Sequence, residues 1–469
     1  MSNGVDGERG SVEIFALGVN SFGQLGIGDR IRKERYIPTK FGVVDGTNGD
    51  EATPYDGNEV VDVQCGGHFT CVLKRDGDVE LSGCITGEIF PRLTRVHVPF
   101  PPKAVQVACG IKHCLLLFDS SCVLSWGTGY FGQLGHGDDN TLEEPMLIKA
   151  LTPQALGYCR VTSIAAGGNH SGAVTNDGPA FMWGLNRSGQ CGVALKADSI
   201  LSPKPIATKK IGGSLDIKKL VCGRNHSGLL TNDGKVYTWG ATSFGRTGQN
   251  VSTSTKIISS PAEIPLFSSQ PARDLVSGDF HMLALAAGGN GVYSWGYGCD
   301  GQCGQSSLLH LRTPRLIEHF NELNVEIDTI ECGSTWSMAK DADGYLYAWG
   351  YGDGGWMGLK PPPSETMPVL ESDNAADYPI IHEHEQIQSF DCEYCAIVPQ
   401  RVTLLKNKVV HSVRCGGGHT ILITSPRASR PAHVLEGISD EKESNFMLAS
   451  SDEEPPNEDA TLSSGAERK

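Results

Sequence analysis

Residues 223–248 read GRNHSGLLTNDGKVYTWGATSFGRTG, and this stretch decides the fold. It opens with a glycine, and three residues later a histidine begins an apolar segment. Asn232-Asp233-Gly234 follows, and Asp-Gly between alternating segments is the composition of a two-residue hairpin turn. The next segment alternates as a strand does and ends at Trp239-Gly240, before a glycine-rich turn. The stretch predicts two antiparallel strands and a loop.

Both halves of this stretch recur in alternation. The Trp-Gly half is a strand that ends in glycine and is followed by Gly-Gln-x-Gly or a variant of it; its glycines are Gly18, Gly83, Gly127, Gly184, Gly240, Gly296 and Gly350. The copy at Leu81-Ser82-Gly83 is worn, because its Gly-Gln turn is missing. The other half begins at Gly66, Gly110, Gly167, Gly223, Gly278, Gly333 and Gly416. Three residues after these glycines come Phe69, His113, His170, His226, His281, Trp336 and His419.

The period predicts an all-β fold, a single seven-bladed propeller. Units of about 55 residues with closely spaced turns hold four short strands, the size of one propeller blade. The chain begins with a strand of one motif and ends with a strand of the other, so the N-terminal strand is expected to complete the last blade. We therefore assign a flexible N-terminus to residues 1–11, the propeller to 12–424, with insertions at 27–59 and 361–408, and a disordered acidic tail to 425–469.

Composition limits the function classes. The chain has 469 residues, 58 of them glycine, and a formal net charge of −15, which argues against general binding of nucleic acid or anionic membranes. No apolar run reaches the length of a membrane span, and the start of the sequence lacks the features of a signal peptide. The cysteine content fits a reducing compartment. We expect a monomer in the cytoplasm, the nucleus or both, without membrane insertion.

Residues able to do chemistry are few. The five repeat histidines recur at one position in successive blades, so we interpret them as structural residues that bond backbone between strands. His382, His384, Cys392 and Cys395 are the right ligand types for zinc, but their spacing matches no common zinc-finger order; we assign no metal or cofactor and leave zinc open. No phosphate-binding loop or nucleophile elbow is present, so a bond-making enzyme is not indicated.

The alternation of Trp-Gly-x-x-x-x-Gly-Gln-x-Gly with Cys-Gly-x-x-His resembles the regulator of chromosome condensation repeat family over about nine tenths of the chain. The resemblance implies a propeller that binds proteins, and its best-known activity is guanine-nucleotide exchange on the small GTPase Ran. Exchange-active members carry aspartates between the glycine and histidine of the second and third copies. Here those positions hold Ile111-Lys112 and Gly168-Asn169, and an aspartate occurs only in the fifth copy.

Three functions therefore stay open. The preferred one is a protein-interaction propeller that regulates a small GTPase; the others are an exchange factor for a Ran-like GTPase and a chromatin-associated or other scaffold. Chromatin contact would need the basic cluster Arg30–Arg35 to take the place of the basic N-terminal arm of chromatin-bound members. Direct binding of nucleic acid is not expected. The residues next to the repeat histidine, or to its replacement, are the predicted partner-binding set: Lys112, Asn169, Asn225, Asp279, Phe280 and Thr335.

Overall fold

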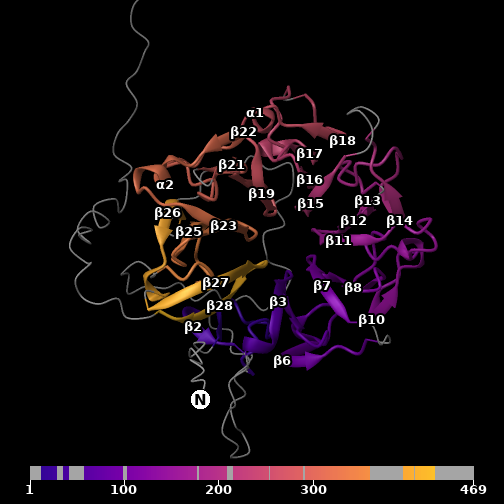
Figure 1. Ribbon diagram of the computed structural model, residues 1–469, viewed down its shortest axis with the longest axis horizontal. Coiled ribbons are helices and arrows are strands. Elements are labelled where there is room, and N and C mark those ends of the chain that lie inside the picture. Colours follow the sequence, from indigo (N-terminus) through magenta and orange to yellow (C-terminus); the bar gives the residue numbers. More distant parts are fainter. Residues whose placement is uncertain are drawn as a thin grey trace, which may run out of the picture. The chain divides into compact units, whose positions relative to one another are not determined.

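The computed structural model describes residues 12–28, 35–41, 57–98, 103–176, 179–208, 215–252, 254–288, 291–359, 395–405 and 407–427. Residues up to Pro426 form one compact unit, in which seven four-stranded antiparallel sheets are arranged around a central axis (Figure 1). The prediction of a seven-bladed propeller is confirmed. Its short helices are η1 (Gly57–Glu59), η2 (Lys149–Leu151), η4 (Ser243–Gly245), α1 (Leu266–Ser269), α2 (Glu318–Glu322) and η5 (Thr403–Leu405).

Six blades are built from consecutive strands, of which the first lies nearest the axis. Blade 1 is β3 (Val60–Cys65), β4 (Phe69–Lys74), β5 (Val79–Cys84) and β6 (Ile89–Arg95). Blade 2 is β7 (Ala104–Cys109), β8 (His113–Phe118), β9 (Val123–Gly127) and β10 (Leu142–Leu147). Blade 3 is β11 (Val161–Ala166), β12 (His170–Thr175), β13 (Phe181–Leu185) and β14 (Ser199–Pro205).

The second half of the ring follows the same plan. Blade 4 is β15 (Ile217–Cys222), β16 (His226–Thr231), β17 (Val236–Ala241) and β18 (Ile257–Glu263). Blade 5 is β19 (Ala272–Ser277), β20 (His281–Ala286), β21 (Val292–Gly296) and β22 (Leu311–Leu316). Blade 6 is β23 (Ile327–Cys332), β24 (Trp336–Asp341), β25 (Leu346–Tyr351) and β26 (Cys395–Arg401).

Blade 7 closes the ring with strands from both ends of the propeller. It consists of β27 (Lys408–Cys415), β28 (His419–Pro426), β1 (Glu13–Gly18) and β2 (Arg35–Lys40), in the spatial order β2-β1-β28-β27. β1 pairs with β28 from Glu13 opposite Thr424 to Gly18 opposite His419. The expected closure is confirmed, with two N-terminal strands in place of one. Because β1 pairs with it, β28 has a neighbouring strand on both sides and does not form an open edge.

The structure shortens the two predicted insertions. β2 lies inside the range 27–59 and β26 inside 361–408, and each is the outermost strand of its blade. An outermost strand is exposed to solvent and carries neither repeat motif, as Ile37 of β2 shows with 71% exposure. The sequence signal at these two strands was therefore weak. β28 also runs to Pro426, two residues beyond the predicted end at 424, while the expected tail from 428 onward and residues 1–11 lie outside the described residues.

The repeat residues bond one blade to the next. His113 Nε2 and Ser171 Oγ lie 2.8 Å apart across the junction of blades 2 and 3, and both Ser171 Oγ and Trp183 Nε1 donate to the carbonyl of Gln133. The single hydroxyl proton goes to that carbonyl, so the imidazole Nε2–H donates to Oγ. Equivalent histidine–hydroxyl pairs are His170 with Ser227, His281 with Ser337 and His419 with Thr70.

These contacts correct one prediction. The histidines are structural, as expected, but their partners are side-chain hydroxyls of the neighbouring blade rather than backbone. At the junction of blades 4 and 5, Met282 stands where the hydroxyl would be, and His226 Nε2 instead contacts Ser277 Oγ at 3.1 Å. A buried imidazole needs a partner, and the alternative hydroxyl supplies it.

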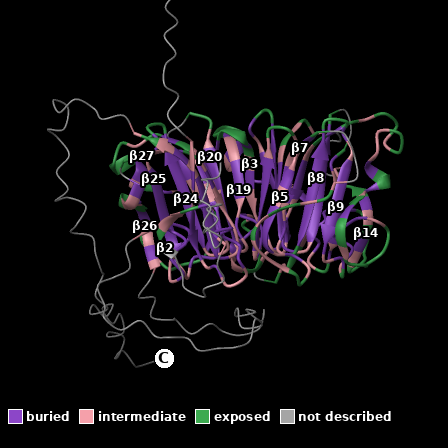
Figure 2. Cartoon of the chain, turned by 90° about the horizontal axis from the view of Figure 1, so that it is seen from below, coloured by how far each residue is buried: buried purple, intermediate pink, exposed green. Residues whose placement is uncertain are grey.

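The core lies between the blades, where the strands are buried and the exposed residues gather at the loops (Figure 2). Trp126, Trp183, Trp239, Trp295 and Trp349 are at most 2% exposed, so the repeat tryptophan fills the junction with the preceding blade. In the part of the chain that the structure describes, no helix is long and apolar enough to cross a membrane.

Candidate functional site

One end of the propeller collects the turns that carry both motifs, and we call it the turn face. In each blade the turn between the first two strands lies beside the start of the loop that follows the third strand. The amide one residue after the repeat Gly donates to a carbonyl of that turn in every blade: Val19 to Gly418, Cys84 to His68, Thr128 to Lys112, Leu185 to Asn169, Ala241 to Asn225, Tyr297 to Phe280 and Tyr351 to Thr335.

This geometry places all six predicted partner-binding residues on the turn face. The backbone carbonyls of five of them accept hydrogen bonds from the amides just described, so the fold sets their positions around the ring. These five are Lys112, Asn169, Asn225, Phe280 and Thr335. The Lys112 side chain is exposed, and those of Asn169, Asn225 and Thr335 are half-buried. The set is distributed over blades 2 to 6 and does not converge on one point.

Asp279 has an internal role that the sequence analysis did not foresee. Its Oδ2 lies 3.2 Å from Arg224 Nη1 of blade 4 and accepts a hydrogen bond from Ser334 Oγ of blade 6 at 3.0 Å. The Arg224 amide also donates to the Asp279 carbonyl. The carboxylate therefore ties three blades together, with 19% of the side chain exposed. Asp279 therefore has a structural role in the turn face.

An arginine–aromatic cluster lies next to this ion pair, made of Arg224, Phe244, Arg246, Phe280, Tyr297 and His310. The Arg246 guanidinium lies 4.8 Å from the centre of the Phe280 ring and 5.4 Å from that of Phe244. Phe244 packs edge-on against Tyr297 at 5.2 Å and lies 4.9 Å from the His310 ring. Burial, assisted by Arg246, lowers the pKa of His310, so its ring stays neutral beside the guanidinium.

A substitution in the repeat creates the cluster. In four other loops the side-chain oxygen of the glutamine in Gly-Gln-x-Gly accepts a hydrogen bond from the backbone amide two residues before it. These glutamines are Gln24, Gln133, Gln190 and Gln302. Arg246 occupies this position in blade 4, is 1% exposed, and donates from Nε to the Ser243 carbonyl at 3.1 Å. Phe244, at φ +60°, presents its ring above the guanidinium.

The loops of the turn face also expose apolar side chains. Tyr130 of blade 2 is 71% exposed, Leu195 of blade 3 is 49% exposed, and Leu308 and Leu309 of blade 5 are 39% and 69% exposed. They lie in the loops after β9, β13 and β21, on three of four consecutive blades, with the arginine–aromatic cluster between the last two. Exposed apolar residues gathered on loops of a rigid scaffold are typical of a protein-binding surface.

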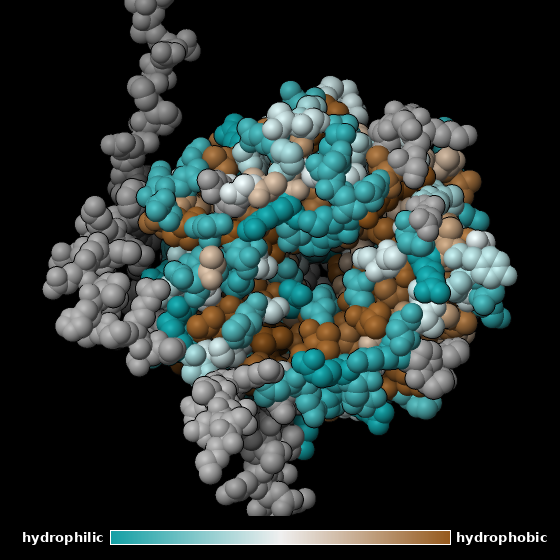
Figure 3. All heavy atoms as spheres, viewed as in Figure 1, coloured by the Kyte–Doolittle hydropathy of each residue, from teal (hydrophilic) through white to brown (hydrophobic). Residues whose placement is uncertain are grey.

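The centre of the ring is hollow (Figure 3) and holds a cavity of about 110 Å³. Its wall is the ring of repeat turns, several of which bond to the next, as from the Gly417 amide to Gly66 and from Gly168 to Gly223. Charges on the inner strands pair across neighbouring blades, Asp62 with Arg414 at 3.0 Å and Lys219 with Asp274 at 2.7 Å. These ion pairs neutralise charges that line the channel and join neighbouring blades of its wall.

Two other sequence candidates cannot be placed as sites. His382, His384 and Cys392 lie outside the described residues, and Cys395 is the first residue of β26. In the basic cluster Arg30–Arg35, only the backbone of Arg35, the first residue of β2, is described. Zinc binding and direct contact with nucleic acid are therefore untested predictions.

Sequence reasoning missed Arg246, Phe244 and the exposed loop side chains. Arg246 had a readable signal, because it replaces a glutamine that recurs in four other loops. Tyr130 and Leu309 had none, since loops carry no periodic pattern from which exposure can be inferred.

Comparisons with known proteins agree with this architecture. The model of the RCC1-like domain matches residues 9–326. The ultraviolet-B receptor UVR8 of Arabidopsis thaliana is 28% identical over 357 residues, which cover 74% of each chain. The human E3 ubiquitin-protein ligase HERC2 is 30% identical over 74% of this chain but only 7% of its own length, and mouse protein RCC2 is 30% identical over 57% of this chain and 51% of its own.

Solved structures show the same fold. The crystal structure of Prp20p from Saccharomyces cerevisiae matches with a TM-score of 0.70 and 20% identity, over 90% of this chain and 93% of that one. That of human WBSCR16 matches with a TM-score of 0.67 and 19% identity, over 87% of this chain and 99% of the other. The resemblance inferred from the repeats is confirmed.

Proposed function

Because the chain belongs to the RCC1-like domain family, we propose that it is a protein-interaction propeller that regulates a small GTPase through its turn face. The observation that carries this proposal is the set of exposed apolar residues in the loops of blades 2, 3 and 5, together with the arginine–aromatic cluster of blades 4 and 5. Aromatic side chains and arginine dominate the binding energy of protein interfaces when they lie within a patch that excludes water. Such a regulator acts in the cytoplasm, the nucleus or both.

The relatives support a binding role but differ in what they bind. The structure of Prp20p was described together with its binding to Gsp1p and histones. UVR8 is named an ultraviolet-B receptor and HERC2 an E3 ubiquitin-protein ligase, so the names of the relatives do not point to one common partner. The partner of this chain is therefore to be sought from the chemistry of its own turn face.

Exchange activity is the sharper alternative, and it has a distinct signature. An exchange factor accelerates nucleotide release because it binds the nucleotide-free GTPase more tightly than the loaded one. A scaffold has no reason to discriminate between these states. The Asp279 carboxylate, the aspartate nearest to the exchange pattern, is engaged with Arg224 and Ser334, which favours a binding role over exchange.

Affinity capture from cell extract tests the GTPase proposal. The full chain is immobilised, and the extract is divided between EDTA and GTP with magnesium before mass spectrometry. A small GTPase recovered in both conditions supports regulation without exchange, and one enriched only after nucleotide is stripped indicates exchange. Recovery of no GTPase in either condition refutes the proposal.

Matched variants test the surface. Leu309→Asp and Tyr130→Asp each place a charge on an exposed apolar loop residue of the turn face and are expected to weaken capture about tenfold or more. Tyr158→Asp is the control: Tyr158 is 82% exposed, but it lies in the connection from β10 to β11, at the opposite end of the blades. Equal losses in all three variants would contradict the assignment to the turn face.

A further inference from the structure

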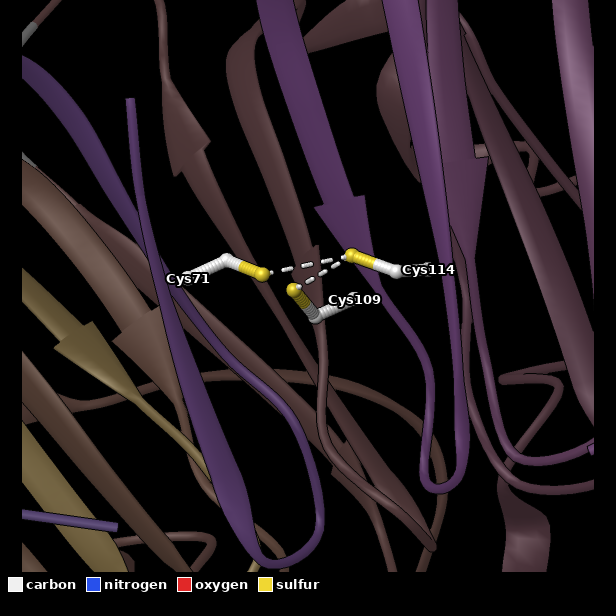
Figure 4. Close-up of side chains that lie close together, drawn as sticks. All are labelled: Cys71, Cys109 and Cys114. Carbon is white, nitrogen blue, oxygen red and sulfur yellow. Dashed lines mark hydrogen bonds between the residues drawn. The ribbon is translucent and has the colours of Figure 1, made fainter. Parts of the chain in front are cut away.

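Three cysteine sulfurs meet at the junction of blades 1 and 2. Cys71 lies on β4, Cys109 ends β7 and Cys114 lies on β8. The Cys114 sulfur is 3.3 Å from that of Cys109 and 3.5 Å from that of Cys71, and all three lie within 4.8 Å of one another. Figure 4 shows the three side chains pointing toward a common point from two blades.

The repeat does not require this cluster. At the position of Cys114 most other blades carry a hydroxyl residue, which pairs with the histidine of the preceding blade: Ser171, Ser227, Ser337 and Thr70. Here the histidine is absent as well, because Phe69 stands in its place. Both partners of the histidine–hydroxyl bond are therefore missing at this junction, and a thiol stands at the position of the hydroxyl.

The surroundings are those of a buried ligand set with one accessible side. Cys71 and Cys114 are fully buried in the apolar core that contains Phe69, Val107 and Leu116. Cys109 is half-buried and lines the cavity of the central channel. The channel beside Cys109 is the side from which an ion would enter, and a bound ion needs such a path.

The donor number selects the kind of ion. In the described part of the chain no fourth histidine, cysteine, aspartate or glutamate joins the group. Three sulfur donors suit a soft ion, since thiolates select Cu(I) and Zn(II), and Zn(II) is almost always four-coordinate. Bonds of about 2.3 Å to three sulfurs around one centre place the sulfurs about 4 Å apart. The sulfurs would therefore have to separate by roughly half an ångström.

We propose that Cys71, Cys109 and Cys114 bind a single thiophilic d¹⁰ metal ion, Cu(I) in preference to Zn(II), which joins blade 1 to blade 2. Each thiol that becomes a ligand releases its proton to solvent, and no electron is transferred. The ion replaces the missing histidine–hydroxyl bond of this junction. Because the site exists only in the folded ring, binding stabilises the propeller by mass action.

Competition with a chromophoric Cu(I) chelator tests the site in the full chain, reduced and kept anaerobic. We expect one tightly bound equivalent, a rise in melting temperature and an X-ray absorption signal of three sulfur neighbours. The same titration with Zn(II) is expected to bind more weakly. Tighter binding of Zn(II) than Cu(I) would overturn the choice of metal.

Variants separate this site from the other thiols of a chain with 15 cysteines. Cys114→Ser restores the residue type found at this position in other blades, and Cys71→Ala removes a second ligand; each is expected to weaken Cu(I) binding by at least about tenfold. Cys222→Ser is the control, because Cys222 ends β15 as Cys109 ends β7 but lies outside the group. Unchanged affinity in both ligand variants, or oxidation of the trio to a disulfide in place of metal binding, would overturn the proposal.

Discussion

Mild acid should strongly destabilise this propeller, because its blades are joined by buried neutral histidines. All five repeat histidines are 0% exposed, and their Nδ1 atoms have no hydrogen-bond partner in the described part of the chain. A second proton would have to be placed on this unpartnered nitrogen. Burial accordingly lowers the pKa to about 3 at His113, His170, His281 and His419, and well below the ordinary 6.5 at His226.

The magnitude follows from proton binding. Below pH 6.5 each of these imidazoles is protonated in the unfolded chain but not in the folded one, so the unfolded state binds more protons and the free energy of unfolding falls as the pH falls. Between pH 7.5 and 5.5 each histidine costs about 1.4 kcal/mol, and five cost about 7 kcal/mol. Burial also lowers the pKa of His68 to about 4, which adds about 1.4 kcal/mol to the loss, and raises the pKa of Asp300 to about 6, which offsets about 1 kcal/mol of it. The net loss is comparable to half of the stability of an ordinary domain.

Urea unfolding followed by tryptophan fluorescence at the two pH values measures this loss. His281→Gln should reduce the difference in unfolding free energy by about 1.4 kcal/mol, since one titrating group is removed. His411→Gln is the control, because His411 is exposed on β27, and it should leave the difference unchanged. A free energy of unfolding that is the same at pH 7.5 and 5.5 would refute the conclusion that the five repeat histidines are buried and neutral.

Three further predictions concern single residues. Gly296→Ala should destabilise the fold by about 1–3 kcal/mol, because Gly296 has φ +111° and a Cβ there would lie 2.5 Å from a backbone oxygen; Gly288→Ala, where nothing lies within 4 Å, should be neutral in the same thermal melt. Asp279→Ala should lower the free energy of unfolding by about 1 kcal/mol while partner capture persists, and the reverse pattern would make Asp279 a contact residue. Lys112→Ala should weaken partner capture more than Thr335→Ala, because the Lys112 side chain is exposed and that of Thr335 is half-buried; equal losses would contradict this ranking.

The fold was readable from the sequence because its repeat residues act locally. In most units the histidine contacts the next unit along the chain and the tryptophan contacts the preceding one, so a fixed spacing carries the whole arrangement. The interpretation was less accurate at the outermost strands β2 and β26, where side chains face solvent and no neighbouring blade imposes a pattern. The six partner-binding candidates lie on one face of the propeller and stay a prediction, and the pairing of Asp279 with Arg224 was not foreseen.

The sequence by itself determined the number of blades, their order and the closure of the ring, since each of these follows from the count and succession of two motifs. Only the tertiary structure decided which side chains meet across a junction. Arg246 lies beneath Phe280, and Cys71 lies beside Cys114, although 34 and 43 positions separate them along the chain (280 − 246 and 114 − 71). Contacts of this kind depend on how neighbouring sheets pack, because a repeat spacing specifies the backbone position of a residue and not the partner that its side chain finds.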